Sequence, residues 1–319
     1  MLDATDFQLV NPWQRGFPLE PRPFEVVGRE AGVSESETLA RLKSLKEKGI
    51  LDRIGPVFRP NTVGASTLAA MAVPAERLAA VAALVSGEPG VNHNYEREHA
   101  FNLWFVATGA TPAAVEEALA RIERASGIRV LRLPLVEELH IDLGFDLDTR
   151  VVPRGSSPGE MREISAEERK LVAAVTSGLP LVRAPYAAVA GELGIAQAEV
   201  IALLGKMLAE GRIRRIGAVI RHRSLGYQAN AMAVWDVPDA IASEVGHALA
   251  ADPAVTLCYR RARALPDWPY NLYCMIHGRE RRRVLDELRR LVRAHGLEAF
   301  PHAVLFSTRC FSQRAARYG

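Results

Sequence analysis

The sequence predicts an α+β protein built as a tandem duplication, in which each copy joins a helix-turn-helix to a βαββαβ unit. The first observation is an internal repeat: Arg-Ile-Gly at 53–55 recurs at 215–217, a displacement of 162 positions. The second is that both copies contain two short helical segments separated by a glycine turn. The third is that each copy then alternates strand-like and helix-like segments in the same order. Two copies of one unit in one chain predict an internal pseudo-dimer, because self-complementary surfaces tend to close around a two-fold axis.

The repeat continues through the rest of each half. His-Asn-Tyr-Glu-Arg at 93–97 aligns with Leu-Cys-Tyr-Arg-Arg at 257–261, and Phe-Asn-Leu-Trp-Phe at 101–105 aligns with Tyr-Asn-Leu-Tyr-Cys at 270–274. Tyrosine and arginine therefore occur at matching positions in both copies, whereas the histidine of the first copy is replaced by Leu257. Where the copies differ, we expect their roles to differ.

The helix-turn-helix of each copy is marked by capping residues and glycines. In the first copy, helices are expected at 24–31 and 34–48, with a turn at Gly32 and a stop at Gly49. In the second copy, a capping box at 165–168 begins a helix that runs to 175, and further helices are expected at 186–193 and 196–210. Their turn is at Gly194 and their stop at Gly211.

The segments that follow have the order strand, helix, strand, strand, helix, strand, which is the ferredoxin-like plan. The first copy has them at 66–73, 75–85, 91–97, 101–108, 112–125 and 130–138. The second copy has them at 228–237, 240–250, 255–261, 271–277, 280–294 and 298–307.

We therefore predict five segments along the chain. They are a helix-turn-helix domain at 1–62, a ferredoxin-like domain at 63–145, a linker at 146–163, a second helix-turn-helix domain at 164–224 and a second ferredoxin-like domain at 225–319. The linker is assigned from its proline, glycine and serine residues, which suit a solvated connection.

The composition fits a folded protein of the cytoplasm. The chain has 319 residues, is 49% hydrophobic, and has a net charge of +3 from 40 basic and 37 acidic residues, too near balance for wholesale nucleic-acid binding. Its three cysteines, Cys258, Cys274 and Cys310, are odd in number and widely spaced, which disfavours a disulfide framework and a zinc site. The N-terminus has no signal-peptide pattern, and no apolar run approaches the roughly 20 residues that span a bilayer. We expect a cytoplasmic protein that is neither exported nor embedded in a membrane.

Common catalytic motifs are absent from the sequence. It contains no Walker loop, dinucleotide fingerprint, nucleophile elbow or HExxH metal motif. Phosphate transfer and nicotinamide chemistry therefore have no support.

A candidate site lies on the first-copy strand at 91–97. Because strand side chains alternate, His93, Tyr95 and Arg97 point to one face of the sheet. Both helices of a ferredoxin-like unit cover one side of its sheet, and we expect these side chains on the open side, lining a cleft between the copies. The second copy places Leu257, Tyr259 and Arg261 at the matching positions.

Two histidines stand out from the others. His93 and His99 flank one predicted hairpin segment, and His99 is expected at its tip, beside Asn102 and Trp104. Imidazole can ligate iron or deliver a proton near neutral pH. The alternative for each is an ordinary structural role, which is how His140, His247, His277 and His302 are interpreted.

Cations and aromatic rings accompany the candidate strand. The densest cationic set near the predicted cleft is Arg97, Arg260, Arg261 and Arg263. Guanidinium groups bind carboxylates bidentately, although these residues could equally form a solvated hairpin rim. Flat walls for a planar ligand could come from Tyr95, Trp104, Tyr259, Trp268 and Tyr273. The alternative for these aromatic residues is ordinary core packing.

The helix-turn-helix elements also raise the possibility of DNA binding. The helix at 34–48 carries Arg41, Lys43, Lys46 and Lys48, which could face phosphates. Its counterpart at 196–210 offers Gln197, Glu199, Lys206 and Glu210 among alanine, leucine and glycine. The sequence therefore does not support a matched pair of groove-reading helices.

A helix-turn-helix followed by a βαββαβ unit resembles the Lrp/AsnC family of transcription regulators. The segments at 53–58, 93–105, 258–261 and 268–273 resemble more specifically the sirohaem decarboxylases, which use an Lrp-like fold without regulating genes. The resemblance covers both halves nearly end to end, and the chain is similar to the fused form in which two subunit types are joined. It implies conversion of sirohaem to 12,18-didecarboxysirohaem by removal of two acetate carboxyls as CO2, in haem d1 biosynthesis or the alternative haem pathway.

The same resemblance implies roles for particular residues. His93 and His99 would be catalytic, one as axial ligand or anchor of the substrate iron and the other as general acid, with the assignment between them left open. Substrate binding would involve Tyr95, Arg97, Asn102, Trp104, Tyr259, Arg260, Arg261 and Asn271. No cofactor is expected beyond the iron of the substrate. Leu257 departs from second-type subunits that carry histidine there, which implies one competent pocket per chain or a second pocket that works differently.

Two other functions compete with this interpretation. One is a DNA-binding transcription regulator of the Lrp/AsnC type that responds to a tetrapyrrole, and the other is a small-molecule sensor without chemistry. Our expectation for partners is a tetrapyrrole substrate, no specific DNA and no membrane. An internal pseudo-dimer is expected, and a further homodimer is left open.

Overall fold

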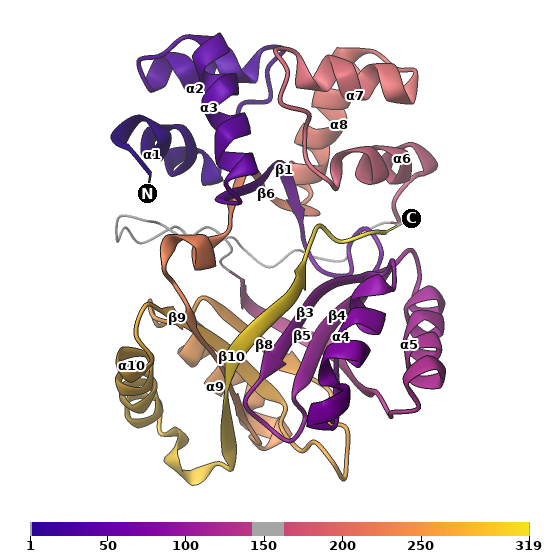
Figure 1. The fold of residues 1–319 in the computed structure, drawn as a ribbon, viewed down its shortest axis with the longest axis vertical. Helices are drawn as coiled ribbons and strands as arrows, with labels where there is room; N and C mark the ends of the chain where they lie inside the picture. The colour runs from indigo at the N-terminus through magenta and orange to yellow at the C-terminus, as the bar shows by residue number, and fades with distance from the viewer. Residues whose placement is uncertain (1, 142–162, 319) are drawn as a thin grey trace. The chain divides into compact units, whose positions relative to one another are not determined.

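The computed structural model describes residues 2–141 and 163–318, which fall into two compact units (Figure 1). The first unit contains the helical segments of both repeats, up to Val63 and Leu225, together with Tyr318. The second contains the alternating segments of both repeats, which begin at Gly64 and Gly226. Each unit therefore joins one repeat to the other. Apart from Glu163, the predicted linker at 146–163 lies outside the described residues.

The first unit contains the two predicted helix-turn-helix elements. Its helices are α1 (Ala4–Val10), η1 (Pro12–Gln14), α2 (Pro23–Glu30), α3 (Glu35–Glu47), α6 (Ala166–Val175), α7 (Pro185–Leu193) and α8 (Gln197–Ala209), followed later in the chain by η3 (His222–Leu225). The pairs α2–α3 and α7–α8 form the motif, and α7 and α8 meet at 100°. The predicted capping box is present, since Ser165 and Glu168 each accept a hydrogen bond from the backbone of the other.

A short two-stranded sheet explains the most obvious sequence repeat. Strands β1 (Leu51–Phe58) and β6 (Ile213–Ile220) pair antiparallel, with Gly55 opposite Gly217. The carbonyl oxygen of Ile216 accepts a hydrogen bond from the Phe17 N–H at 3.1 Å. In the other copy, the carbonyl oxygen of Ile54 accepts the equivalent bond from the Leu179 N–H at 2.7 Å. The repeated motif therefore lies on the pseudo-two-fold axis of this unit.

The glycine in this motif is required by close backbone approach. A Cβ atom added to Gly217 would overlap the backbone of Gln14 in η1. A residue with a side chain therefore cannot take this position unless that backbone shifts. A Cβ atom added to Gly55 would lie 3.1 Å from the Cα atom of Gly178. No secondary structure was predicted for this segment, because its strands pair only with each other, across the two repeats.

The second unit is a closed eight-stranded barrel made from the two βαββαβ segments. The first repeat contributes β2 (Ala65–Met71), η2 (Ala75–Arg77), α4 (Leu78–Gly87), β3 (Val91–Arg97), β4 (Leu103–Gly109), α5 (Pro112–Ser126) and β5 (Leu131–Ile141). The second contributes β7 (Ala229–Trp235), α9 (Asp239–Ala250), β8 (Leu257–Arg261), β9 (Leu272–Gly278), α10 (Arg281–Ala294), η4 (Leu297–Ala299) and β10 (His302–Gln313).

The strand order of the barrel follows from the duplication. Going round, the strands are β10, β3, β4, β2, β5, β8, β9 and β7, with β7 paired to β10. Within each repeat the last strand pairs with the first and then continues onto the other repeat: β5 pairs with β2 and β8, and β10 pairs with β7 and β3. These two equivalent crossings close the barrel and give it an internal two-fold relation. The predicted α+β duplication and pseudo-dimer are confirmed.

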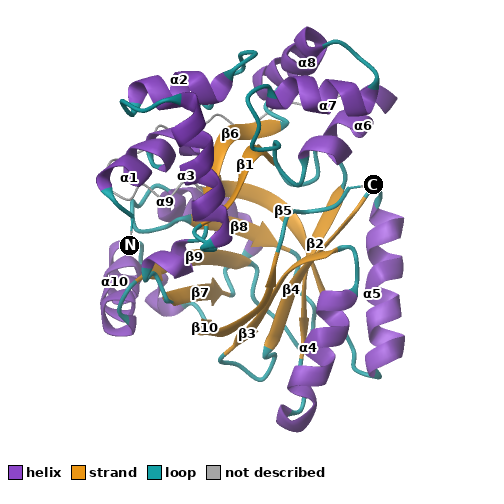
Figure 2. Ribbon diagram, turned by 45° about the horizontal axis from the view of Figure 1, so that its top comes forward, coloured by secondary structure: helices purple, strands orange, loops and turns teal. Residues whose placement is uncertain are grey.

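Helices cover the outside of the barrel (Figure 2). Helices α4 and α5 pack on the sheet of the first repeat, and α9 and α10 on that of the second. The interior is packed with apolar and aromatic side chains from both repeats, among them Trp104, Trp268, Tyr273, Leu133 and Leu305. Burial of apolar side chains in such a core is the main source of stability for a fold of this kind.

The final strand differs from the prediction. We predicted a strand at 298–307, but residues 297–299 form the 3-10 helix η4, and β10 runs from His302 to Gln313. The strand is longer because, beyond Phe306, it leaves its own sheet and pairs with β3 of the other repeat. A pattern read within one repeat cannot reveal that pairing.

None of the described helices is by itself long and apolar enough to cross a bilayer. Helices α7 and α8 reach that length and composition only when they are counted together across their bend.

Candidate functional site

The candidate strand β3 points its predicted site residues into the barrel. The Asn94 amide donates a hydrogen bond of 3.0 Å to the Ala82 carbonyl on α4, so Asn94 faces the covering helix. By alternation, His93, Tyr95 and Arg97 face the interior. The rings of His93 and Tyr95 are stacked, with centroids 6.1 Å apart and planes inclined by 24°.

Two arginines inside the barrel are related by the internal two-fold. Arg97 donates a hydrogen bond of 3.2 Å to the Leu305 carbonyl in β10, and Arg261 donates one of 2.9 Å to the Leu133 carbonyl in β5. Each arginine therefore reaches the last strand of the other repeat. The Arg97 guanidinium carbon lies 5.9 Å from the ring centroid of Tyr95, and that of Arg261 lies 5.1 Å from Tyr259. The tyrosine–arginine pairs predicted from the repeat are thus equivalent in space.

These guanidinium groups are cationic donors in a low-dielectric setting. Burial lowers the pKa of Arg261, and the Tyr259 and Tyr273 rings beside it act in the opposite direction. An arginine still keeps its charge at neutral pH, because its ordinary pKa is above 12. The Arg261 Nε atom is buried, and the described residues offer it no hydrogen-bond partner. Arg261 can therefore donate a hydrogen bond to a ligand's carboxylate.

The other predicted arginines are directed elsewhere. Arg260 is next to Arg261 in β8, so its side chain points to the opposite face of the strand. It donates a hydrogen bond of 3.0 Å to Glu137, which also accepts a hydrogen bond from Ser243 on α9. Burial opposes ionisation of Glu137, but its hydrogen bonds from Ser243 and Arg260 leave its pKa lowered. Arg263 is bound by Asp236 at 2.7 Å and Asp239 at 2.6 Å. The predicted cluster of four arginines is therefore not formed: strand alternation turns Arg260 outward, and two carboxylates hold Arg263.

Asn102 and Asn271 have structural hydrogen bonds. The amide of Asn102 accepts from the Val73 N–H at 2.9 Å and donates to the Val73 carbonyl at 2.8 Å. The amide of Asn271 makes the same two bonds with Val237, at 3.0 and 2.9 Å. Each asparagine thus ties a strand start to the end of a neighbouring strand. Their predicted contact with a substrate has no support in this geometry.

Trp104 is part of the barrel core. Its side chain is 1% exposed, and its indole N–H donates a hydrogen bond of 2.7 Å to the Phe101 carbonyl. Its edge-on contact with Trp268 brings the ring centroids to 5.0 Å. Core packing was the alternative expected for this residue, and the structure shows that packing.

His99 lies at the tip of the β3–β4 hairpin, where the hairpins of the two repeats meet. Its ring is edge-on to Trp268 of the β8–β9 hairpin, with centroids 5.2 Å apart. Its Nδ1 accepts a hydrogen bond of 3.0 Å from the Phe101 N–H, so the neutral ring carries its hydrogen on Nε2. Burial lowers the pKa of His99 and favours this neutral form.

The two predicted catalytic histidines are not adjacent. His93 is near the start of β3, paired with Val106 and Gln313, whereas His99 follows the end of that strand. Between them lie the interior Tyr95 and Arg97. The structure therefore places the two imidazoles at opposite ends of a tyrosine–arginine layer.

Residues from the other repeat complete the surroundings of β3. The Tyr95 hydroxyl donates a hydrogen bond of 3.2 Å to Gln313 in β10, and an Arg97 nitrogen lies 4.0 Å from the Met275 sulfur in β9. Gln313 and Met275 were not among the predicted site residues. Their positions depend on strand pairing between the repeats, for which the sequence carries no local signal.

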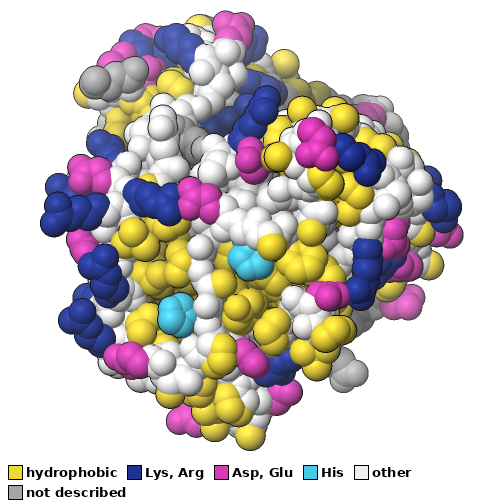
Figure 3. All heavy atoms as spheres, turned by 60° about the horizontal axis from the view of Figure 1, so that its bottom comes forward, with side chains coloured by type: hydrophobic (Ala, Val, Ile, Leu, Met, Phe, Trp, Pro, Cys, Tyr) yellow, Lys and Arg dark blue, Asp and Glu magenta, His cyan; other side chains and the backbone are white. Residues whose placement is uncertain are grey.

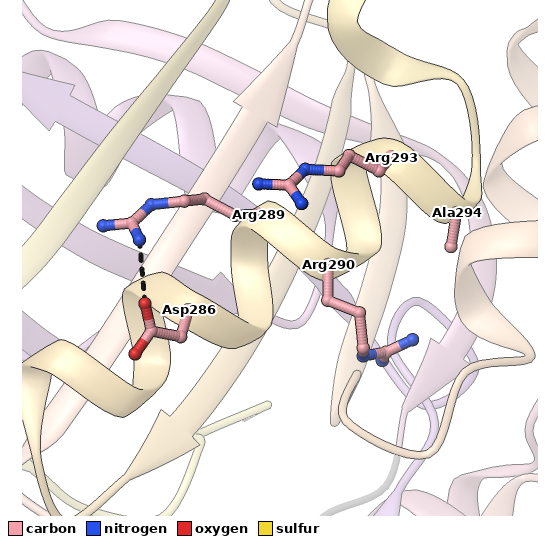
Figure 4. Close-up of a pocket in the computed structure, with 5 residues that line it drawn as sticks. All are labelled: Asp286, Arg289, Arg290, Arg293 and Ala294. Carbon is pink, nitrogen blue, oxygen red and sulfur yellow. Dashed lines mark hydrogen bonds and ion pairs between the residues drawn. The ribbon is translucent and has the colours of Figure 1, made fainter.

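A surface hollow of about 540 Å³ lies on α10, away from these residues (Figure 4). It is lined by Asp286, Arg289, Arg290, Arg293 and Ala294, all from one helix. Arg289 forms an ion pair with Asp286 at 2.8 Å, and Arg290 is bound by Asp252 at 2.7 Å. Exposed pairs of this kind contribute little energy, and the hollow contains none of the predicted site residues.

One face of the molecule is rich in apolar side chains. Figure 3 shows hydrophobic side chains gathered on that face, with histidine among them and lysine or arginine near its margin.

Comparison with known protein families accounts for both units. A model of the AsnC-like ligand binding domain matches residues 63–140 and 224–312. A model of the siroheme decarboxylase NirDL-like HTH domain matches residues 6–51 and 168–214. Each model matches twice, as the duplication requires.

Full-length relatives settle the family. The siroheme decarboxylase NirDL subunit of Paracoccus denitrificans is 47% identical over 323 residues, covering 99% of this chain and 97% of that protein. This chain belongs to the sirohaem decarboxylase family. A more distant family member, the siroheme decarboxylase of Hydrogenobacter thermophilus, is 33% identical over 96% of this chain and 92% of its own length.

Other sirohaem decarboxylases match only half of the chain. The NirD subunit of Stutzerimonas stutzeri is 49% identical over 46% of this chain and 96% of its own length. A solved structure of the siroheme decarboxylase NirDL matches 99% of this chain and 94% of its own, with a TM-score of 0.71 and 29% identity. A second structure of that enzyme, in complex with an iron-uroporphyrin III analogue, gives a TM-score of 0.70, with the same identity and coverage. The chain therefore has the fused two-subunit form within the sirohaem decarboxylase family.

Proposed function

We propose that this protein is a carboxy-lyase that converts sirohaem to 12,18-didecarboxysirohaem by releasing two acetate carboxyls as CO2. The observation that carries the proposal is the 47% identity to a siroheme decarboxylase NirDL subunit along 99% of the chain. The two matching tyrosine–arginine pairs agree with a substrate that is large, flat and anionic. The product would enter haem d1 biosynthesis or the alternative haem pathway.

The described side chains suit such a substrate. Arg97 and Arg261 are cations for carboxylates, and Tyr95 and Tyr259 are aromatic neighbours for a macrocycle. The iron would arrive with the substrate, and we propose no other cofactor. A related siroheme decarboxylase has been crystallised with an iron-uroporphyrin III analogue, which supports an iron tetrapyrrole as ligand class.

The chemistry requires one proton for each acetate group. Protonation of the pyrrole carbon next to the one that bears the acetate creates an electron sink, into which the electrons of the carbon–carbon bond move as CO2 leaves and an exocyclic methylene forms. A proton added to the methylene carbon gives the methyl group, and loss of the first proton from the ring carbon restores the pyrrole. We propose that His93 and His99 supply the proton donor and the contact to the iron, while Arg97 and Arg261 hold neighbouring carboxylates.

The hydrogen bonding of His99 favours one division of these roles. Since its Nδ1 accepts the Phe101 N–H, its Nε2 carries a hydrogen and can donate to the substrate. An iron ligand must instead present a nitrogen lone pair. This geometry favours His93 as the iron contact. Neutral His99 can donate a hydrogen bond to the substrate, and it acts as the proton donor only after a proton has displaced the Phe101 N–H from Nδ1.

The regulator alternative finds less support. In helix-turn-helix proteins, the start of the second helix contacts bases. Here Glu35, in the first turn of α3, is bound by Arg22, and Ser36 accepts a hydrogen bond of 3.4 Å from Arg183. Arg41, a predicted phosphate contact, is bound by Asp3 at 2.9 Å and by Asp6 at 3.1 Å. These groups would have to leave their partners before they could contact DNA.

The setting of the reaction follows from the same proposal. We propose a cytoplasmic enzyme with no specific DNA or membrane partner. The internal pseudo-dimer provides both repeats of the site, and whether two chains associate further is a separate question for measurement of mass in solution.

The proposal is tested by incubating the purified protein anaerobically with sirohaem and quantifying released CO2. We expect two CO2 per sirohaem consumed. Binding of sirohaem without CO2 release would favour the sensor alternative, and steeply salt-dependent, sequence-selective binding to duplex DNA would favour the regulator.

A further inference from the structure

Strand β10 of the second repeat brings Gln313 to the candidate strand of the first repeat. From Ser307 onward β10 pairs with β3, and its last residue, Gln313, is directly opposite His93 (Figure 1). Directly opposed residues of two antiparallel strands project from the same face of the sheet. Gln313 therefore shares the interior face of β3 with His93 and Tyr95.

The side chain of Gln313 contacts one of these site residues. Its Oε1 atom accepts a hydrogen bond of 3.2 Å from the Tyr95 hydroxyl. In the parts of the chain that the structure describes, Tyr95 is the only hydrogen-bond partner of this amide. The amides of Asn102 and Asn271, by contrast, bind backbone groups of neighbouring strands. Gln313 is therefore directed at a site residue rather than at the backbone.

Tyr95 lies between the other two site residues of β3. Its ring is stacked with that of His93 at a centroid distance of 6.1 Å, and the Arg97 guanidinium carbon lies 5.9 Å from its centroid. A tyrosine side chain turns about two torsion angles, so a hydrogen bond at its hydroxyl fixes the end of the ring that is farthest from the backbone. The bond to Gln313 therefore holds the ring in the orientation in which it contacts His93 and Arg97.

Gln313 is itself held in place by the residue that follows it. The Arg314 N–H donates a hydrogen bond of 2.8 Å to the carbonyl of Asn92, which is next to His93 in β3. The Arg314 guanidinium donates three more, of 2.7 to 2.8 Å, to the carbonyl oxygens of Ser86, Glu88 and Val91. Hydrogen bonds from a charged donor are about twice as strong as those between neutral groups. The end of β10 is thus fastened to the first repeat, which gives Gln313 a defined position beside β3.

The second repeat has a different pair at the equivalent position. There β5 pairs with β8 as β10 pairs with β3, and Ile141 is opposite Leu257. Neither isoleucine nor leucine can form a hydrogen bond through its side chain. Tyrosine and arginine are therefore common to both repeats, whereas histidine and glutamine occur together in one repeat and are both replaced by aliphatic residues in the other. The glutamine accompanies the imidazole and is not required by the fold itself.

We propose that Gln313 is a positioning residue of the first repeat, which keeps the Tyr95 ring in the orientation that holds His93 for reaction with the substrate. Gln313 acts through Tyr95 and need not touch the substrate. It comes from the second repeat, so the site built on β3 requires both halves of the chain. This inference rests on the proposed function, because it concerns the turnover of sirohaem.

Steady-state decarboxylation of sirohaem by the full chain tests this role. Gln313→Leu should lower kcat by about 3- to 10-fold and leave KM nearly unchanged, because one hydrogen bond between uncharged groups is lost and the reacting geometry depends on it. Gln313→Glu keeps an acceptor oxygen for the Tyr95 hydroxyl and should restore most of kcat. The matched control is Ser312→Ala, on the opposite face of β10, which should behave like the parent chain.

A double-mutant cycle with Tyr95→Phe separates positioning from an independent effect. If Gln313 acts through the Tyr95 hydroxyl, adding Gln313→Leu to Tyr95→Phe should lower kcat no further. Added to Tyr259→Phe, the corresponding change in the second repeat, Gln313→Leu should lower kcat by its full factor.

Three results would overturn the proposal while the parent chain is active. They are an unchanged kcat in Gln313→Leu, a loss in the double variant that equals the product of the two single losses, and a Gln313→Glu variant as slow as Gln313→Leu. A parent chain that releases no CO2 from sirohaem instead contradicts the proposed function, and with it this inference.

Discussion

At the scale of single residues, the difference between His93 and Leu257 is the most informative. Both are first in an alternating series that continues with tyrosine and arginine, and those later residues make equivalent contacts in the two repeats. The structure therefore keeps the tyrosine–arginine pairs symmetric and varies the imidazole. This arrangement suits sirohaem, whose two reacting acetate groups are alike but lie at different positions of the macrocycle.

Removal of His93 should mainly affect turnover. We expect His93→Ala to lower the rate of sirohaem consumption by about 10²- to 10⁴-fold, because a positioned acid or a precise ligand contact is lost. The rate is measured anaerobically under single-turnover conditions, with His302→Ala as the matched control. Unchanged turnover in His93→Ala would refute its catalytic assignment.

The environment of His99 predicts an effect of pH on stability. Burial holds its pKa in the folded protein below the ordinary value of 6.5, so the unfolded chain takes up this proton first as the pH falls. The stability that neutral His99 contributes is therefore fully present above about pH 6.5. It is lost as the pH falls from there towards the lower pKa of the folded state. Urea unfolding at pH 7.5 and 5.5 should show a smaller loss for His99→Gln than for the parent chain. An equal loss in both proteins would contradict this account.

At the scale of secondary-structure elements, glycine at the centre of β1 and β6 allows the two helix-turn-helix repeats to close on each other. Gly217→Ala should destabilise the first unit by about 1–3 kcal/mol, because the new methyl group would overlap the backbone of Gln14. The matched control is Gly191→Ala within α7, where no atom lies within 4 Å of the added carbon. That change should stabilise the helix by up to about 1 kcal/mol. Both are measured by thermal unfolding, and equal melting temperatures for the two variants would contradict the close approach.

Most elements could be predicted from the sequence because their signals are local. Glycine stops, the Ser165 capping box and the alternation of β3 each depend on neighbouring residues, and their predicted bounds agree closely with the structure. The pairing of β1 with β6 and the extension of β10 to Gln313 depend on contacts between repeats. No local pattern encodes those contacts, so neither was predicted.

The candidate site was only partly predictable for the same reason. The interior direction of Tyr95 and Arg97 follows from strand alternation. The sequence grouped Arg260 and Arg263 with Arg261 because they are close along the chain. In the structure, Glu137 of β5 holds Arg260, and Asp236 and Asp239 hold Arg263. Asn102 and Asn271 were predicted to bind the substrate; in the structure their amides bond the backbone of Val73 and Val237, and their contact with a substrate stays a prediction. Repetition identified matching positions without distinguishing a structural from a functional purpose.

At the scale of the whole molecule, the duplication places both repeats in one barrel, so that each arginine inside it is held by the other repeat. A regulator of the same fold would instead use its two helix-turn-helix elements on DNA. We expect no sequence-selective binding to duplex fragments in gel-shift titrations at 50 and 200 mM salt. A sequence preference that persists at the higher salt would contradict this expectation.

The central claim is that the chain removes two acetate carboxyls from an iron tetrapyrrole. Mass spectrometry of the tetrapyrrole recovered after anaerobic incubation with sirohaem tests it most directly. We expect a product lighter than sirohaem by two carbon dioxide units, with an intermediate lighter by one at early times. Recovery of sirohaem with unchanged mass, from protein that is folded and has bound it, would contradict the account.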